Sequence, residues 1–297
     1  MFDRSKIRTY PLASRPSKVS ISDVKPLSPI EDPIDSADFR DLIARIKAAK
    51  TAKKPIIFMM GGHAIKQGLS RYIVDLIDKG FITHLATNGA ASIHDFEMAF
   101  GGETSEDVAA RIKDGSFGMA EETGRWINEA INKDTEKGYG YAHGKMIEER
   151  NLPLKDLSVS YKCFKKGVPY TVHVGIGADI IHQHPACDGA RLGLATYNDF
   201  LKFTDTVCHL GGDSSPGGVV LNVGCAVMMP EVFLKAVSIS RNLGFKNFRI
   251  TSANFDMIDH YRPRVNVVER PTADGGKGFF FKEKHERSIP SLWMALC

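Results

Sequence analysis

The sequence predicts a three-layer α/β fold in which helices cover both faces of a mostly parallel sheet. Apolar runs such as 55–60 and 81–87 are typical of strands buried on both faces, as in parallel sheets. A helical pattern separates the two runs, and each run ends at a turn of small residues. Ligands of such sheets bind where the strands end, against the turns and the helix N-termini. We therefore expect the functional site at these turns.

The composition limits the class of protein. A chain of 297 residues can bury a full core, and 43% hydrophobic with 25% charged residues is ordinary for a soluble globular protein. A net charge of +4 without a basic stripe argues against nucleic acid as a partner, and no segment reaches the roughly 20 apolar residues of a membrane span. The five cysteines are scattered without CxxC spacing, which indicates buried thiols in the cytoplasm rather than disulfides or structural zinc.

Residues 1–35 carry five prolines and little periodicity, which predicts an extended N-terminal arm lying on the body. Such an arm can embrace a neighbouring subunit, and a loose tail is the alternative. Residues 36–297 are predicted to form a single α/β domain. Its first helix is capped by Ser36 and runs through Lys50.

Helices and strands alternate through the rest of the domain. One helix through Leu76 is expected after the first strand, and a helical insertion at about 104–151 follows the second strand. Whether this insertion is a lid or a subunit contact stays open. The remaining elements follow the same patterns: strands at 169–174, 219–223 and 245–252, and helices at 198–208 and from Pro230 onward. The mixed-sign run 282–287 is interpreted as solvated surface.

Small-residue turns recur after the strands, at 61–62, 88–90, 175–177 and 222–226. Their recurrence favours a nucleotide-binding crevice of the Rossmann-like kind. The strict G-x-G-x-x-G fingerprint is missing, although Gly175-Ile176-Gly177 is a partial start. No Walker lysine motif is present, which excludes ATP chemistry of the P-loop kind.

Residues 55 to about 256 resemble the deoxyhypusine synthase family, an NAD-binding family. The resembling segments are the first turn and helix (61–69), a strand with an acidic helix start (83–97), the proline-alanine-x-aspartate-glycine segment (185–189) and a glycine turn with its helix (220–232). Residues 88–97 are also similar to the asparagine-alanine…histidine-aspartate-x-glutamate stretch of the ornithine cyclodeaminase-type family. That family carries the lysine-ketoglutarate reductase/saccharopine dehydrogenase name. Both resemblances imply NAD as the cofactor.

The chain departs from the synthase pattern in three places. The family's lysine-histidine-histidine after the last glycine turn is replaced by residues 226–230. The tryptophan-glycine-lysine that supplies its imine-forming lysine is not recognisable, and Lys277 is the candidate substitute, with a plain surface lysine as the alternative. The acidic segment that would hold a polyamine is absent. We therefore expect a deoxyhypusine synthase-like enzyme that is not a true deoxyhypusine synthase.

A bound NAD would need backbone N–H groups for its diphosphate and a carboxylate for its ribose hydroxyls. The predicted cofactor-binding residues are Gly61, Gly62, Asn88, Gly89, Ala90, Asp188, Gly189, Asp213, Asn222, Gly224 and Asp256. The ribose carboxylate is sought among the three aspartates, and turn capping is the alternative role for each of them.

The predicted catalytic residues are His94, His63 and Lys277. In His94-Asp95-x-Glu97, a histidine beside a carboxylate can move protons near neutral pH. The alternative is that the two acids only stabilise the positive end of a helix. His63 is similarly placed after the first strand.

His182 and His184, with Asp179 and Asp188, form a candidate site for a divalent metal. Ordinary packing of a polar loop is the preferred interpretation, so no metal is predicted.

These observations favour an enzyme of the NAD-dependent transferase or deaminase/lyase type. It would act on a small amine or amino acid by transient oxidation, elimination or transfer, and return of the hydride. A phosphosugar-type isomerase or lyase is the first alternative, with Ser214, Ser215 and Gly217 at the phosphate. A non-catalytic nucleotide-binding sensor or scaffold is the second. We expect a homo-oligomer, either a dimer or a tetramer.

Overall fold

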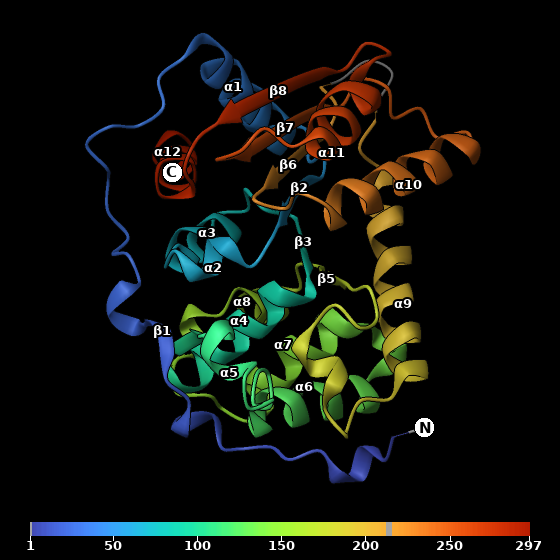
Figure 1. Ribbon diagram of the computed structural model, residues 1–297. Coiled ribbons are helices and arrows are strands. Elements are labelled where there is room, and N and C mark those ends of the chain that lie inside the picture. Colours follow the sequence, from blue (N-terminus) through green and yellow to red (C-terminus); the bar gives the residue numbers. More distant parts are fainter. Residues whose placement is uncertain (1, 212–215) are drawn as a thin grey trace.

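The computed structural model describes residues 2–211 and 216–297, and within them a six-stranded parallel sheet forms the centre of the molecule (Figure 1). The strand order is β5-β3-β2-β6-β7-β8. The strands are β2 (Ile56–Met60), β3 (His84–Asn88), β5 (Tyr170–His173), β6 (Val219–Val223), β7 (Thr251–Asp256) and β8 (Lys277–Lys282). Counted along the chain, the sheet strands follow the order 3-2-1-4-5-6, which reverses between β2 and β6. The predicted α/β fold class is confirmed.

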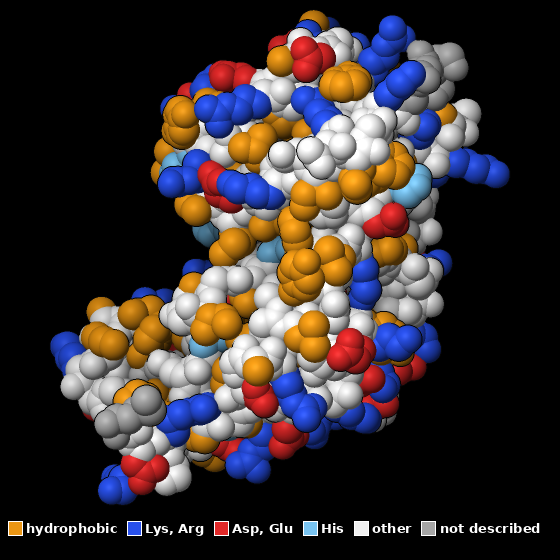
Figure 2. Space-filling view, turned by 90° about the vertical axis from the view of Figure 1, so that its right-hand side faces the viewer, with side chains coloured by type: hydrophobic (Ala, Val, Ile, Leu, Met, Phe, Trp, Pro, Cys, Tyr) orange, Lys and Arg blue, Asp and Glu red, His pale blue; other side chains and the backbone are white. Residues whose placement is uncertain are grey.

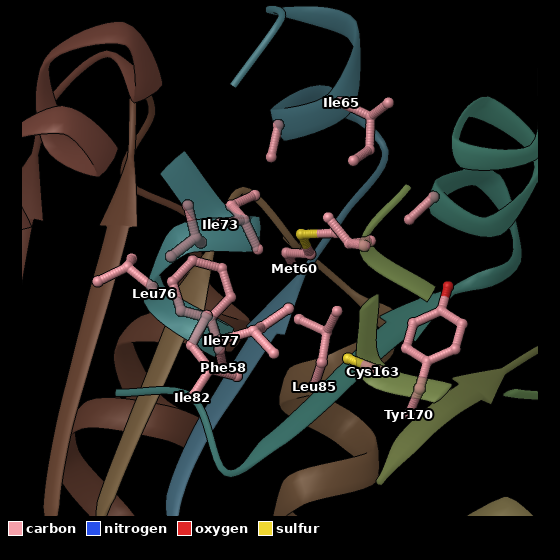
Figure 3. Packing of buried hydrophobic residues seen from close by; sticks show 14 of the residues in the cluster. Phe58, Met60, Ile65, Ile73, Leu76, Ile77, Ile82, Leu85, Cys163 and Tyr170 are labelled. Carbon is pink, nitrogen blue, oxygen red and sulfur yellow. The ribbon is translucent and has the colours of Figure 1, made fainter. Parts of the chain in front are cut away.

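β2 shows why the sheet is buried on both faces. Its side chains alternate between the two faces, and all of them are buried. Ile56, Phe58 and Met60 pack into one hydrophobic cluster, whereas Ile57 and Met59 pack into the other. Figure 3 shows Phe58 and Met60 among apolar side chains from α3 and β3. A strand without polar residues therefore stabilises two cores at once.

Helices cover both faces, as Figure 1 shows. One face carries α1 (Ala37–Thr51), α3 (Ser70–Asp78), α4 (Gly89–Gly101) and α12 (His285–Leu296). The other face carries α9 (Gly189–Cys208), α10 (Met228–Asn242) and a π-helical turn at Arg264–Glu269. The remaining helices are α2 (His63–Lys66), α5 (Val108–Arg111), α6 (Glu121–Lys133), α7 (Tyr139–Glu149), α8 (Val159–Lys166) and α11 (Tyr261–Pro263).

Residues 2–35 run along the outside of the body (Figure 1). A short strand, β1 (Ser17–Ser20), pairs antiparallel with β4 (Glu103–Glu106). Further along, the Lys25 amide donates to the Gly68 carbonyl at 2.9 Å, and the Ile34 amide donates to Ser291 Oγ at 2.9 Å. Backbone pairing and side-chain bonds thus attach this segment at several points.

Some predicted elements differ from the structure for identifiable reasons. The single helix expected through Leu76 breaks into α2 and α3 at Gly68, where φ is +72° and the backbone packs against Asp23. Most of the helix start expected at 104–107 is strand β4, because β1 pairs with it, and only Asp107 caps a short helix, α5. The strand expected at 245–252 begins only at Thr251.

Two segments contain more helix or strand than their sequence patterns predict. The helix expected at 198–208 begins at Gly189, because Asp188 caps it. The run 282–287 is the end of β8 and the start of α12. Lys282 and Lys284 are exposed, as expected of solvated surface, but His285 between them is only 1% exposed. None of the helices in the described ranges is long and apolar enough to cross a membrane.

Candidate functional site

The carboxyl ends of β2 and β6 meet where the strand order reverses. Gly61 packs directly on Gly224, because a Cβ at position 61 would overlap the Gly224 carbonyl oxygen. Gly62 faces α4: its added Cβ would lie 2.8 Å from His94 Cδ2 and 3.3 Å from the Ala90 carbonyl oxygen. The structure therefore brings these five predicted residues together. Figure 2 shows the surface hollowed between two bulkier parts, with histidine side chains in the hollow.

The helix N-termini at this edge differ in whether they are capped. α2 follows β2, and its N-cap residue Gly62 offers no side chain. α10 follows β6, and its Met229 amide donates to Cys225 Sγ at 3.4 Å. α4 is capped by Asn88, whose Oδ1 accepts from the Ala91 amide at 3.1 Å, and α9 is capped by Asp188. The Gly61 and Gly224 amides donate to the carbonyls of Val223 and Phe255, so among the described residues the first N–H groups of α2 are the donors at this junction that no side chain accepts from. Asn88 and Asp188 therefore act as helix caps. For Asp188, capping is the alternative to the predicted ribose-binding role.

Two further glycines and Asn222 have structural surroundings of their own. The Asp179 carboxylate occupies the space that a side chain on Gly89 would need. Gly189 opens α9 with nothing near it. Asn222 Nδ2 donates to the Cys225 carbonyl at 3.0 Å and so holds the turn after β6. Asn222 thus shapes the turn from inside the protein.

The other predicted site residues are dispersed. Asp256 ends β7 at the carboxyl edge, where its Oδ1 accepts from the Ile258 amide at 3.3 Å. Lys277 begins β8 and is exposed at the opposite, amino edge, so the assignment of Lys277 as an imine-forming group of this site is corrected. Asp213 lies outside the described residues.

A cavity of about 230 Å³ lies beside the first turn. It is bounded by α2, α4, the loop after β5 and the N-terminal segment with β4. The lining residues are Arg15, Lys66, Ala90, Ile93, His94, Glu97, Ser105, Glu106, Val108, Phe117, Ala178, Asp179 and Ile180. Typical ligand pockets measure about 300–1,000 Å³, so this cavity suits a small metabolite and is too small for a dinucleotide.

The cavity holds groups of opposite charge and unusual proton affinity. Burial raises the pKa of Asp179 to about 6. Burial lowers the pKa of His94 to about 4, so this imidazole is neutral at physiological pH. Lys66 has no ion pair among the described residues, whereas Glu106 accepts from the Gly118 amide at 2.7 Å. The cavity therefore offers one unpaired ammonium, one carboxyl group that titrates near neutrality and one neutral imidazole.

The carboxylate that acts on His94 is Glu97, and not its neighbour Asp95. Asp95 points away into a buried cage, where it accepts from Ser158 Oγ and Ser160 Oγ at 2.6 Å each. Glu97 reaches His94 through a hydroxyl: Thr104 Oγ1 is 2.7 Å from His94 Nδ1 and donates to Glu97 Oε2 at 2.6 Å. Helical geometry explains the difference, because adjacent residues of α4 face different directions.

His63 lies in a second group at the same edge. Its ring is 5.5 Å from the ring of buried His285, and Gln67 Nε2 is 3.1 Å from His63 Nε2. Burial lowers the pKa of His285, although the charge of Asp256 opposes this shift. The His285 ring occupies the space over Gly224, whose φ is +64°. Position 224 thus requires glycine for both its conformation and its neighbour.

The candidate metal site is not assembled in the described residues, and the candidate phosphate site lies partly outside them. His182 Nδ1 accepts from the Gly177 and Asp179 amides, and His184 Nδ1 accepts from Ala186, so both rings stabilise their own loop. Across the described part of the chain, no three His, Cys, Asp or Glu side chains are placed to hold a metal ion. Gly217 precedes β6 and packs on Arg249 at the amino edge, away from the cavity, and Ser214 and Ser215 lie outside the described residues.

Sequence reasoning missed several residues that line or support the site. Arg15 arrives from the N-terminal segment, Thr104 from a strand expected to be a helix start, and His285 from a run interpreted as surface. Lys66 belongs to none of the sequence motifs. Asp179 was considered only for a metal. The partial glycine fingerprint just before Asp179 was the one signal that could have directed attention to it.

Comparison with known proteins supports the fold. No family model matches the chain, and no curated protein matches it in sequence. A putative deoxyhypusine synthase from Entamoeba histolytica shares 12% identity with a TM-score of 0.51, covering 88% of each chain. AgrE, solved with ornithine and NAD+, shares 16% identity with a TM-score of 0.51. ArgZ, an arginine dihydrolase from the cyanobacterial ornithine–ammonia cycle, shares 14% with a TM-score of 0.50.

The two latter proteins are much longer than this chain. The matches cover 89% of this chain in both cases, but 34% of AgrE and 33% of ArgZ, so the chain spans about a third of either protein. These likenesses confirm the deoxyhypusine synthase-like fold that the sequence motifs predicted.

Proposed function

We propose that the chain is an NAD-binding enzyme that oxidises an amine or amino acid transiently and then eliminates or transfers a group. The charged cavity carries this proposal, because the unpaired ammonium of Lys66 and the carboxyl group of Asp179 line one small space. A ligand with both a carboxylate and an amine complements these two groups. The fold is shared with about a third of AgrE, which has been solved with ornithine and NAD+.

The turns at the β2/β6 junction fit the diphosphate of NAD. Gly61 and Gly62 lead into α2, whose first N–H groups have no side-chain acceptor within the described residues. Because Gly61 packs directly on Gly224, no side chain separates the two turns, which would let a diphosphate approach the start of α2. Asp256 is the candidate for the ribose hydroxyls, since its Oδ2 accepts no hydrogen bond within the described residues. When bound, NAD would accept and return a hydride.

Asp179 and His94 would divide the proton chemistry. An amine must lose its ammonium proton before it can be oxidised, and Asp179, with a pKa of about 6, is ionised at neutral pH to take it. Neutral His94 would accept a hydrogen bond from the same amine through Nε2. Two groups whose environments shift their pKa values differently are typical of acid–base sites.

Thermal-shift measurements on the full chain test the cofactor. A ligand present at 100 times its Kd stabilises a protein by about 2.7 kcal/mol, so NAD should raise Tm measurably. Nicotinamide absorbance during incubation with amines and amino acids then tests turnover. Stabilisation by sugar phosphates without stabilisation by NAD would replace this proposal with the phosphosugar enzyme. NAD binding without any turnover would favour the sensor.

A pair of lysine variants tests the cavity. Lys66→Ala should abolish stabilisation by amino acids and preserve stabilisation by NAD. Lys277→Ala, which removes an exposed lysine at the opposite edge of the sheet, is the matched control and should preserve both. Equal responses of the two variants would remove Lys66 from the substrate site.

A further inference from the structure

The carboxylate of Glu97 is buried and fully engaged. Arg15 donates to both of its oxygens, at 2.7 and 2.8 Å, and the two side chains are each 1% exposed. Thr123 Oγ1 donates to Oε1 at 3.0 Å, and Thr104 Oγ1 donates to Oε2 at 2.6 Å. A carboxylate in a bidentate pair with a guanidinium is ionised and can only accept hydrogen bonds.

The Thr104 hydroxyl therefore decides where the proton of His94 lies. A hydroxyl has one hydrogen, and Thr104 donates it to Glu97. The 2.7 Å contact between Thr104 Oγ1 and His94 Nδ1 must then be made by a hydrogen on Nδ1. The reverse arrangement would leave two lone pairs facing each other across 2.6 Å.

The other ring nitrogen is left for the cavity. Burial keeps His94 neutral, so a hydrogen on Nδ1 means none on Nε2. Nε2 has no hydrogen-bond partner within the described residues, and the ring lines the cavity with its Cδ2 edge toward Gly62.

We infer that Arg15, Glu97 and Thr104 form a positioning chain that holds the hydrogen of His94 on Nδ1 and presents Nε2 to the cavity as a hydrogen-bond acceptor. The N-terminal segment contributes to this positioning chain in two ways. It supplies Arg15, and its strand β1 pairs Val19 with Thr104 and so fixes the strand that carries the hydroxyl. These residues act on a ligand only through His94. The catalytic use of Nε2 rests on the proposed function, whereas the position of the hydrogen does not.

Nitrogen NMR of ligand-free, ¹⁵N-histidine-labelled full-length protein tests the chain. The His94 signals are identified by their loss in His94→Gln. The expected pattern has a protonated Nδ1 and a bare Nε2 in the wild type and in Thr104→Ser, which keeps the hydroxyl. In Thr104→Val the hydrogen should leave Nδ1, at least in part, for Nε2. A bare Nδ1 in the wild type, or an unchanged pattern in Thr104→Val, would overturn the inference.

Thr123→Val is the matched control. It removes a hydroxyl that donates to the same carboxylate without touching His94, so it should cost similar stability and leave the nitrogen pattern unchanged. A shift in Thr123→Val equal to that in Thr104→Val would show a general loosening and contradict the chain. Because no ligand is present, failure here is distinct from failure of NAD to bind, which the thermal-shift measurement reports separately.

Discussion

Replacing Arg15 with methionine tests whether the N-terminal segment is energetically part of the body. Arg15 and Glu97 form a bidentate ion pair with almost no exposure to solvent. Methionine fills much of the same volume but leaves the carboxylate without its cation. Thr104 and Thr123 would remain as its only side-chain partners in the described structure.

The cost follows from burial. Removing one partner of a buried ion pair typically costs about 3–5 kcal/mol, whereas exposed pairs contribute about 0–1 kcal/mol. Unfolding of a 297-residue chain carries an entropy of about 2.1 cal/mol/K per residue, so this loss lowers Tm by roughly 5–8 °C. Glu97→Gln should cost a comparable amount because Arg15 then remains buried and unpaired. The double variant should cost clearly less than the two single costs together.

Urea unfolding followed by circular dichroism measures these differences. Lys18→Met is the control. Lys18 lies on the same N-terminal segment as Arg15 and pairs with Asp107, and both side chains of this pair are about half exposed. It should change stability by less than about 1 kcal/mol. Costs for Arg15→Met as small as those of the control, or single costs that simply add in the double variant, would refute the argument from burial.

Three further predictions follow from individual residues. Gly61→Ala should destabilise the protein by about 1–3 kcal/mol through overlap with the Gly224 carbonyl, whereas Gly189→Ala, with open space around it, should be neutral or slightly stabilising in urea unfolding. If the enzyme turns over, kcat/KM should rise as pH increases through about 6, where Asp179 ionises. Asp179→Asn should lose most of the activity and also this rise in the pH profile. An unchanged rise in the variant would show that another group titrates there. Burial lowers the pKa of His143 from its ordinary 6.5 to about 3, so the unfolding free energy falls as pH decreases from 6.5 toward 3, where only the unfolded chain binds the proton. His143→Gln should reduce this pH dependence by up to ~1.4 kcal/mol per pH unit, and an unchanged slope would contradict the shift.

The glycine turns illustrate how far local patterns could lead. The sequence shows that Gly61, Gly62 and Gly224 follow strands, and parallel strands place their ends at one edge, so their convergence was predictable. The pattern could not show that Asn88 and Asp188 cap their own helices, because the same residue types serve caps and ligands equally well. It also placed Lys277 near the site, although a lysine at the start of a parallel strand must lie at the other edge.

The partners of His94 illustrate what lies beyond local patterns. Asp95 is adjacent in sequence, yet the structure pairs His94 with Glu97 through Thr104, and pairs Glu97 with Arg15 from 82 residues away. No periodicity reports such contacts, because they depend on how β1 and β4 pair and how α4 is rotated against them.

By itself, the sequence determined the layered α/β architecture and the edge of the sheet at which a site would form. The spacing of apolar residues and the identity of turn residues are local properties of the sequence. Such properties suffice to predict the succession of strands and helices along the chain. Only the tertiary structure decided which charged groups share the cavity, which aspartates are occupied as caps and where the hydrogen of His94 resides. Those outcomes depend on distances between segments far apart in the chain, and on the removal of water from between them.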